Sequence, residues 1–384
     1  MFTRITQLLE KNRKTKIIFL VFCFSLLSFY PIFRNFYYAN GILTYERHIA
    51  FLEKRSEFYN PWQYRILCPM MVEGLIWTYD HTLDRIFPLE EKVHFKVNST
   101  TGTTDITDQF LQLTQNKEAF KYIMMFILFR FAEHLAIFFL GYILWSYFIK
   151  NDWLLFFGLI FLSLSMGNAV AVADLTLNTY LDIILYLLTA CLIVYRGNPL
   201  WLIPIITLGA LNRETSLMIP FLYFVSCMDF SRLNLKKFSF SDLGFPKARV
   251  WLLVFIQYVI FFTLFIWIRN YYGYRPQHEW KVPAGLPMLR LNLFSPIGIK
   301  SYFEMIGTFG VIPFIILYKF RRFPALLRLW FIAIVPLWFS VHLLTVVTYQ
   351  TRLFLVPTIL IFLPMMMWLI ENSLVQKTNR SAVS

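Results

Sequence analysis

The sequence predicts an all-α protein that crosses a membrane several times, as a polytopic bundle of about ten transmembrane helices. Hydrophobic residues make up 58% of the 384 positions, and charged residues only 15%, whereas an ordinary soluble domain has about 25% charged residues. The apolar residues also gather in runs, several of them long enough to span a bilayer, separated by polar loops. The surplus apolar surface of such a chain needs lipid to face.

The net charge of +14 is better explained by a membrane than by nucleic acid. The basic residues cluster in short loops between apolar runs, where positive charge sets the orientation of the helices. No basic face interleaved with aromatic residues stands apart from these runs, so we expect no nucleic-acid partner. The four cysteines have neither CxxC nor Cys/His spacing, so neither a disulfide framework nor a zinc site is indicated.

Residues 1–33 are predicted to form a basic cytoplasmic tail and an uncleaved first helix, because the apolar run at 17–33 ends without a small-residue cleavage site. Residues 34–118 then form a long extracytoplasmic loop. Within this loop, the apolar segment at 70–77 is too short to span and predicts an interfacial or re-entrant helix. Residues 96–108 are rich in Thr, Ser, Asn and Asp and predict a polar loop.

Residues 119–370 are predicted to form the helical bundle, and residues 371–384 a second cytoplasmic tail, within a single integral-membrane domain spanning 1–384. The apolar runs of the bundle lie at 119–148, 153–171, 180–195, 200–210, 216–230, 250–268, 302–320, 325–347 and 353–370. When the sides alternate from a cytoplasmic start, every predicted inner loop is basic, as the orientation bias requires. The loop at 269–300 is also basic but lies on the extracytoplasmic side in this topology. Its tyrosines, tryptophan and prolines predict a structured surface.

Between two of the short apolar runs stand Arg213 and Glu214, in the stretch Asn212-Arg213-Glu214-Thr215. Charges at that depth in a bilayer are costly unless they pair or face water, so both are candidate functional residues. One interpretation is a buried structural ion pair at a turn, and we expect the two charges to be coupled as such a pair. The predicted topology places the stretch at the extracytoplasmic mouth, which favours the alternative, a polar cavity.

Two further ionisable residues fall on the same predicted side. Asp182 is expected in the first turn of a helix, where the helix dipole stabilises an anion. The same position would explain the aspartate by a purely structural role, which is the alternative to a functional one. Arg352 stands at the entrance of the last helix, where an arginine either binds a phosphate bidentately or extends toward lipid head groups.

A third set lies inside the predicted helix at 119–148. Arg130, Glu133 and His134 share one helix face. They are expected to form an intrahelical ion pair facing the bundle, with a proton relay as the alternative.

A transfer reaction at a membrane surface needs a carboxylate base for the acceptor hydroxyl and a cation or a divalent metal for the leaving phosphate. Glu46 is the candidate base and His48 a candidate substrate ligand, because both follow soon after the first helix. Arg65, Arg213 and Arg352 are the candidate phosphate ligands. The sequence contains no GxSxG, HExxH, P-loop or Rossmann motif.

Four short motifs follow one another along the chain. They are Tyr64-Arg65-Ile66-Leu67-Cys68-Pro69, Tyr180-Leu181-Asp182, Asn212-Arg213-Glu214-Thr215 and Thr351-Arg352 before a late proline-containing helix. With the first helix and the long loop after it, they resemble the GT-C superfamily of integral-membrane glycosyltransferases, and more closely its bacterial members. The resemblance covers nearly the whole chain as a pattern of topology and short motifs.

The resemblance implies an undecaprenyl- or dolichyl-phosphate-sugar donor, a single inverting displacement, and a bacterial inner membrane as the location. It also implies that an acid of the first long loop serves as the base, with Asp182 as a second candidate catalytic residue. Where the family often has an aspartate, this chain has Asn40-Gly41-Ile42-Leu43, and Glu46 is the nearest acid. The alternatives are a transporter, flippase or polymerase for lipid-linked sugars or polysaccharides, and a non-catalytic membrane scaffold.

Overall fold

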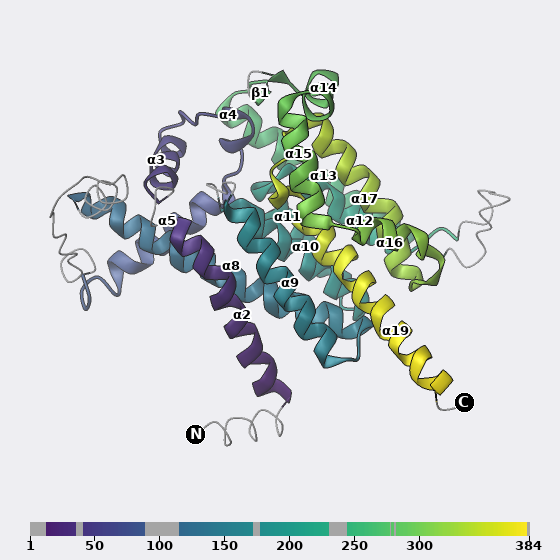
Figure 1. The fold of residues 1–384 in the computed structure, drawn as a ribbon. Helices are drawn as coiled ribbons and strands as arrows, with labels where there is room; N and C mark the ends of the chain where they lie inside the picture. Colours follow the sequence, from purple (N-terminus) through teal and green to yellow (C-terminus); the bar gives the residue numbers. More distant parts are fainter. Residues whose placement is uncertain are drawn as a thin grey trace, which may run out of the picture. The chain divides into compact units, whose positions relative to one another are not determined.

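The computed structural model describes residues 13–35, 41–88, 115–171, 177–229, 244–276, 278–279 and 282–381, and these are predominantly helical (Figure 1). The all-α prediction is therefore confirmed, while the polar loop predicted at 96–108 lies outside the described residues. The chain divides into two compact units. Unit 1 comprises Met1–Phe139 and Leu159–Leu181, and unit 2 comprises Leu140–Gly158 and Asp182–Ser384. The single integral-membrane domain stays a prediction.

Unit 1 is built mainly from the N-terminal helices. They are α2 (Arg13–Asn35), α3 (Gly41–Leu52), α4 (Tyr59–Trp62), α5 (Leu67–His81), the first part of α8 (Lys117–Phe148), the second part of α9 (Asp152–Ala171) and the start of α10 (Asn178–Val194). Ring contacts join α2 to α8, because Phe24 stacks on Phe138 with 6.2 Å between ring centroids. His48 of α3 and Glu73 of α5 both contact Tyr122 of α8.

The short helix expected at residues 70–77 is present as part of α5, while its interfacial or re-entrant position stays a prediction. Pro69 lies in the first turn of α5, where a missing N–H breaks no helical hydrogen bond. In α3, the buried residues Gly41, Thr44, His48 and Phe51 recur every three or four positions, so they share one helix face. That face carries two polar side chains into the interior, which an ordinary amphipathic helix would avoid.

Unit 2 holds the C-terminal part of α8, the N-terminal part of α9 and most of α10, followed by the remaining elements. These are α11 (Leu202–Asn212), α12 (Met218–Ser226), α13 (Ala248–Tyr272), β1 (His278–Glu279), β2 (Val282–Pro283), α14 (Leu286–Phe294), α15 (Pro296–Phe309), α16 (Ile312–Tyr318), α17 (Ala325–Thr345), α18 (Leu355–Pro357) and α19 (Leu363–Ser381). Short 3₁₀ turns lie at Pro199–Trp201, Glu214–Leu217, Phe320–Arg322 and Thr351–Phe354, and a π-helical turn at Thr358–Phe362.

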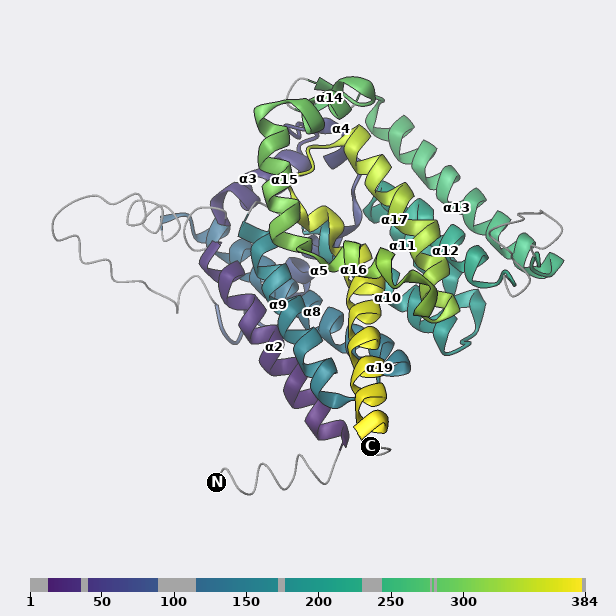
Figure 2. The same cartoon turned by 45° about the vertical axis from the view of Figure 1, so that its right-hand side comes forward.

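Packing inside unit 2 places α11 against α13, and both α12 and α14 against α17 (Figure 2). Buried indoles tie distant segments to each other, since Trp338 Nε1 donates to Leu353 O at 2.8 Å and Trp145 Nε1 to Ile359 O at 2.9 Å. The antiparallel hairpin of β1 and β2, together with α14, confirms that residues 269–300 contain an ordered surface.

The single helix predicted at residues 302–320 is wrong. Two helices, α15 and α16, occupy this region and are bent by 66° at the break between them. Gly310 follows α15 with φ of 52°, a left-handed conformation that favours glycine. Pro313 lies in the first turn of α16, where proline is tolerated. A hydropathy run cannot reveal this break, because both sides of it are apolar.

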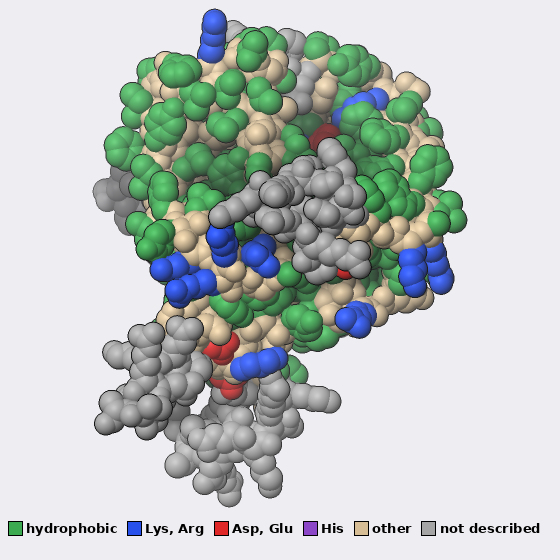
Figure 3. Space-filling model, turned by 90° about the vertical axis from the view of Figure 1, so that its right-hand side faces the viewer, with side chains coloured by type: hydrophobic (Ala, Val, Ile, Leu, Met, Phe, Trp, Pro, Cys, Tyr) green, Lys and Arg blue, Asp and Glu red, His purple; other side chains and the backbone are tan. Residues whose placement is uncertain are grey.

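Four described helices are long and apolar enough to cross a membrane, or five if the bent pair counts as one span. They are Lys117–Phe148, Ala248–Tyr272, Ala325–Thr345 and Thr351–Ser373. Figure 3 shows a face on which hydrophobic side chains predominate, and α13 alone exposes Trp251, Phe255, Phe262 and Trp267. Such a surface belongs in lipid. The chain is a membrane protein with a helical bundle, and the predicted count of about ten spans is not confirmed.

Candidate functional site

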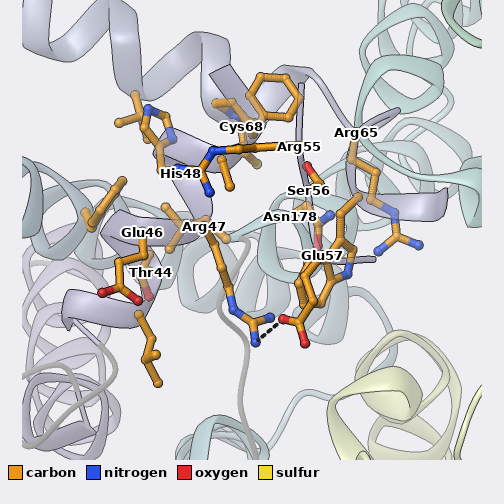
Figure 4. Close-up of a pocket in the computed structure, with 18 residues that line it drawn as sticks. Thr44, Glu46, Arg47, His48, Arg55, Ser56, Glu57, Arg65, Cys68 and Asn178 are labelled. Atoms are coloured by element: carbon orange, nitrogen blue, oxygen red, sulfur yellow. Dashed lines mark ion pairs between the residues drawn. The ribbon is translucent and has the colours of Figure 1, made fainter. Parts of the chain in front are cut away.

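A pocket of about 270 Å³ opens in unit 1 among α3, α4, α5, α8 and the start of α10. Its volume is close to the lower end of the range for small-molecule sites, roughly 300 Å³. The pocket contains three of the residues that the sequence singled out, namely Glu46, His48 and Arg65 (Figure 4). The other polar side chains that line it are those of Thr44, Arg47, Arg55, Ser56, Glu57 and Asn178.

The charges around the pocket are predominantly positive, with three arginines against two glutamates. Arg47 Nη2 lies 3.2 Å from Glu57 Oε2, and its guanidinium lies 4.4 Å from the ring centre of Trp62. In Figure 4 the side chains of Arg47 and Glu57 point toward one another, while Glu46 lies apart from Glu57. Arg55 is exposed and forms an ion pair with Glu53. Guanidinium groups in this number suit an anion such as a phosphate.

Buried hydrogen bonds fix the segment between α3 and α4, which carries part of the pocket wall. Ser56 Oγ donates to Gln63 Oε1 at 2.6 Å, and Gln63 Nε2 donates to Phe51 O at 2.9 Å. Leu177, another lining residue, has a φ of 60° immediately before α10. A non-glycine residue in that region stores about 1 kcal/mol or more of backbone strain.

His48 is held at the inner side of the pocket by residues of α5 and α8. Its Nε2 lies 2.7 Å from Glu73 Oε1, and the hydroxyl of Tyr122 donates to the same oxygen at 3.0 Å. Burial lowers the pKa of His48 below its ordinary value of 6.5, although the Glu73 carboxylate acts in the opposite direction. The imidazole is therefore neutral near pH 7.

Asp182 lies in unit 2 and is fully buried. Thr215 Oγ1 donates to Oδ2 at 2.7 Å, Ser216 Oγ donates to Oδ1 at 3.2 Å, and Arg213 Nη1 lies 3.8 Å from Oδ2. The expected place in the first turn of its helix is wrong, because α10 begins at Asn178 and has no acid in that turn. The carboxylate instead holds the turn between α11 and α12. Its catalytic role stays a prediction.

The turn expected between two short helices lies at Arg213, while the expected coupling of Arg213 with Glu214 stays a prediction. α11 ends at Asn212, Arg213 is extended, and a 3₁₀ turn starts at Glu214. The two charges have ion-pair partners on different helices: Arg213 pairs with Asp182 of α10, and Glu214 Oε1 lies 3.2 Å from Arg269 Nη2 of α13. Each of these charges therefore joins the turn to another helix.

Arg352 lies in the 3₁₀ turn before α18 and donates from Nη2 to Gln350 Oε1 at 2.8 Å. It belongs to unit 2 with Arg213, whereas Glu46 and Arg65 belong to unit 1. The polar cavity expected beside Arg213 stays a prediction, as does the position of these residues on one side of the membrane.

The intrahelical pair in α8 is confirmed. Arg130 Nη1 lies 3.0 Å from Glu133 Oε2, and both side chains are buried. The Arg130 guanidinium lies 4.4 Å from the ring centre of Tyr180, and the His134 ring meets the same ring edge-on at 5.0 Å. The ring of Tyr180 thus contacts both Arg130 and His134.

The sequence did not single out Thr44, Glu73 or Tyr122 as site residues. The sequence spacing could have identified Thr44, because it precedes His48 by four residues and the two share a helix face. Glu73 and Tyr122 approach His48 from α5 and α8. Such contacts between helices follow no local pattern, so no sequence signal marked them.

Within the residues that the structure describes, no group of three or more His, Cys, Asp or Glu side chains is placed to hold a metal ion. Comparisons of the chain with protein-family models, with curated proteins and with solved structures found no match. The pocket of unit 1 is therefore the starting point for a functional proposal.

Proposed function

We propose that this protein is a membrane glycosyltransferase of the GT-C type. It would move a sugar from a polyprenyl-phosphate carrier to an acceptor at the extracytoplasmic face of a bacterial plasma membrane, with its N-terminus in the cytoplasm. One observation carries the proposal: three arginines line the same cavity as two groups that can accept a proton, Glu46 and His48. Transfer of a sugar from a phosphate needs both, a cation for the leaving group and a base for the incoming hydroxyl.

The helix that forms one side of the pocket also suits a lipid carrier. α5 contributes Cys68, Pro69 and Val72 to the lining, while its Met70 and Trp77 are 60% and 63% exposed. A helix with an apolar outer surface lies well at the boundary between head groups and acyl chains. A polyprenyl chain in the bilayer would then leave its phosphate at the level of the pocket.

In the proposed reaction, the acceptor hydroxyl attacks the anomeric carbon on the face opposite the phosphate. The bond from that carbon to the phosphate oxygen breaks, the configuration inverts, and the polyprenyl phosphate leaves with the electron pair. Arg47 and Arg65 would stabilise the charge that grows on the leaving phosphate, because guanidinium groups form paired, charge-assisted hydrogen bonds with phosphate oxygens. The proton of the hydroxyl passes to one of the two bases in the pocket.

The test is sugar transfer in liposomes that contain the purified protein and polyprenyl-phosphate sugars with a labelled sugar. We expect release of polyprenyl phosphate together with a glycosylated acceptor. Arg47→Gln and Arg65→Gln should each lower the rate about 10- to 100-fold, since one hydrogen bond to a charged group contributes about 1.5–3 kcal/mol. Arg85→Gln is the matched control, because Arg85 is exposed in the same unit and outside the pocket. Pocket variants as active as this control would contradict the proposal.

The alternative function is transport, flipping or polymerisation of a lipid-linked sugar. The observation in its favour is the buried set of Arg130, Glu133 and His134 in a helix long enough to span a membrane, since ionisable residues in such a place often mark proton or substrate pathways. Movement of the labelled carrier across the liposome membrane without transfer of its sugar, abolished by Glu133→Gln, would favour this alternative over the transferase.

A further inference from the structure

The ring of His48 has a defined tautomer and orientation. Its Nε2 faces Glu73 Oε1 at 2.7 Å, and a carboxylate oxygen accepts hydrogen bonds, so Nε2 carries the ring proton. Nδ1 then keeps a lone pair. The ring is confined by Tyr122 and Phe126, with centroid distances of 5.3 and 5.5 Å. This is the arrangement of a carboxylate that orients an imidazole as a base.

The other ring nitrogen is the one available to a ligand. Within the described part of the chain, the hydrogen bond of the His48 ring is made through Nε2, and the side chain lines the pocket (Figure 4). A neutral imidazole with a free lone pair inside a pocket can take a proton from a bound hydroxyl.

Thr44 stands one helical turn before His48 and lines the same pocket. It is 2% exposed, and its Oγ1 has no hydrogen-bond partner among the described residues. A buried hydroxyl without a hydrogen-bond partner destabilises the folded protein. A polar atom of a ligand in the pocket would remove that destabilisation, so Thr44 is a second group directed at a bound molecule.

Glu46 is placed less favourably for the same task. It follows Thr44 by two residues, which is about 200° around the helix, and its side chain is exposed. A carboxylate surrounded by water is oriented less well than a ring held on several sides, and positioning decides the efficiency of a base.

We propose that His48 is the base of the transfer, that Glu73 and Tyr122 are its positioning residues, and that Thr44 binds the acceptor hydroxyl. This inference rests on the proposed function and names the base of that same reaction. The hydroxyl proton passes to Nδ1 as the acceptor oxygen bonds to the anomeric carbon, and the phosphate leaves with the electrons of the broken bond. The imidazolium that forms keeps its Nε2–H bond to Glu73.

The charged groups around the ring set the pH behaviour of this step. Glu73 of α5 favours the protonated ring, and Tyr122 of α8 shares the same carboxylate oxygen. The pocket lining also carries the charged side chains of Arg47, Arg55, Arg65, Glu46 and Glu57. The phosphate of a bound donor adds negative charge at the same place, so protonation becomes easier once the substrate is present.

The experiment compares His48→Gln, Glu73→Gln and Thr44→Val with His81→Gln, an exposed histidine of α5 in the same unit. Transfer in liposomes gives kcat and KM, and quenching of tryptophan fluorescence by polyprenyl phosphate gives donor affinity. We expect His48→Gln to lower kcat about 100-fold or more, as loss of a general base does, with donor affinity unchanged. The acid limb of the pH–rate profile should disappear in His48→Gln and move to lower pH in Glu73→Gln.

The outcomes separate the inference from the proposed function. Absence of transfer by the wild-type protein from every polyprenyl-phosphate sugar would overturn the function, and the assignment of a base with it. Transfer by the wild type together with normal kcat and an unchanged pH profile in His48→Gln would overturn only the role of His48, and a loss in Glu46→Gln would then assign the base to Glu46. If His48→Gln does not fold, the acid limb of Glu73→Gln decides, and an unmoved limb overturns the inference.

Discussion

Two groups of charged residues, one in each unit, use the same side-chain chemistry in different surroundings. In unit 2, Asp182 is fully buried and receives hydrogen bonds from Thr215 and Ser216, with Arg213 at 3.8 Å. In unit 1, Arg47 and Glu57 are 24% and 62% exposed, and their pair lies at the edge of a pocket. The first set is enclosed by its own partners, whereas the second faces open volume.

The difference teaches which charges are better placed to act on a ligand. A buried carboxylate that already accepts several hydrogen bonds stabilises a turn and offers little to a substrate. Partly exposed arginines beside a cavity exchange their partners at low cost. The presence of a charged residue within an apolar segment therefore does not by itself identify a functional charge. Partial exposure of the side chain to a pocket is the better criterion.

The largest effect is expected from breaking the enclosed pair. Arg213→Met leaves Asp182 as a buried carboxylate without its arginine, and should lower the free energy of unfolding by about 3–5 kcal/mol. The double variant Asp182→Asn/Arg213→Met should lose less than this single variant, because no lone charge remains. Denaturant unfolding in detergent micelles measures both. Equal stability of the single variant and the wild type would remove the contrast between the two groups.

The next effect concerns the acid stability of unit 1. The pKa of His48 is lowered in the folded state, so below pH 6.5 the unfolded chain takes up this proton before the folded protein does. Stability should therefore fall as the pH drops through 6.5 and below, and this contribution should be constant above that pH. Melting temperatures between pH 7.5 and 5.5 should fall less steeply in His48→Gln than in the wild type. Parallel curves would contradict the burial argument.

A smaller effect is expected at the second ion pair of the turn in unit 2. Glu214 and Arg269 are 33% and 13% exposed, so this pair lies between the enclosed and the open group. Glu214→Gln should cost about 1 kcal/mol or less, as read from the same unfolding experiment. A loss as large as that of Arg213→Met would show that exposure does not rank these pairs.

The smallest change in stability is expected for Glu57→Gln, within about 1 kcal/mol. Its main effect should appear in binding, because Arg47 loses a competitor for a phosphate. The affinity for polyprenyl phosphate should rise by a factor of roughly 2–5, the equivalent of a surface ion pair of up to about 1 kcal/mol. Weaker binding, measured by fluorescence quenching, would indicate that Glu57 positions Arg47 instead of competing for it.

The sequence by itself determined the class of this protein and several of its local features. Apolar runs and helical periods are properties of consecutive residues, so they revealed the membrane helices, the short helix α5 and the break after Asn212. They also placed Arg130 and Glu133 on one face of α8, where the two residues do pair. Their positions soon after the first helix drew attention to Glu46 and His48, and a short motif drew attention to Arg65. These three residues share a pocket.

Only the tertiary structure decided the partners of the charged residues. His48 meets Glu73 from 25 positions away, and Glu214 meets Arg269 from 55 positions away. Asp182 does not lie in the first helical turn, where the helix dipole was expected to stabilise it. Its carboxylate accepts hydrogen bonds from Thr215 and Ser216, in a turn that begins more than 30 residues later. Helix packing brings such residues together, and it depends on the shapes of whole helix faces, which no local pattern of residues encodes.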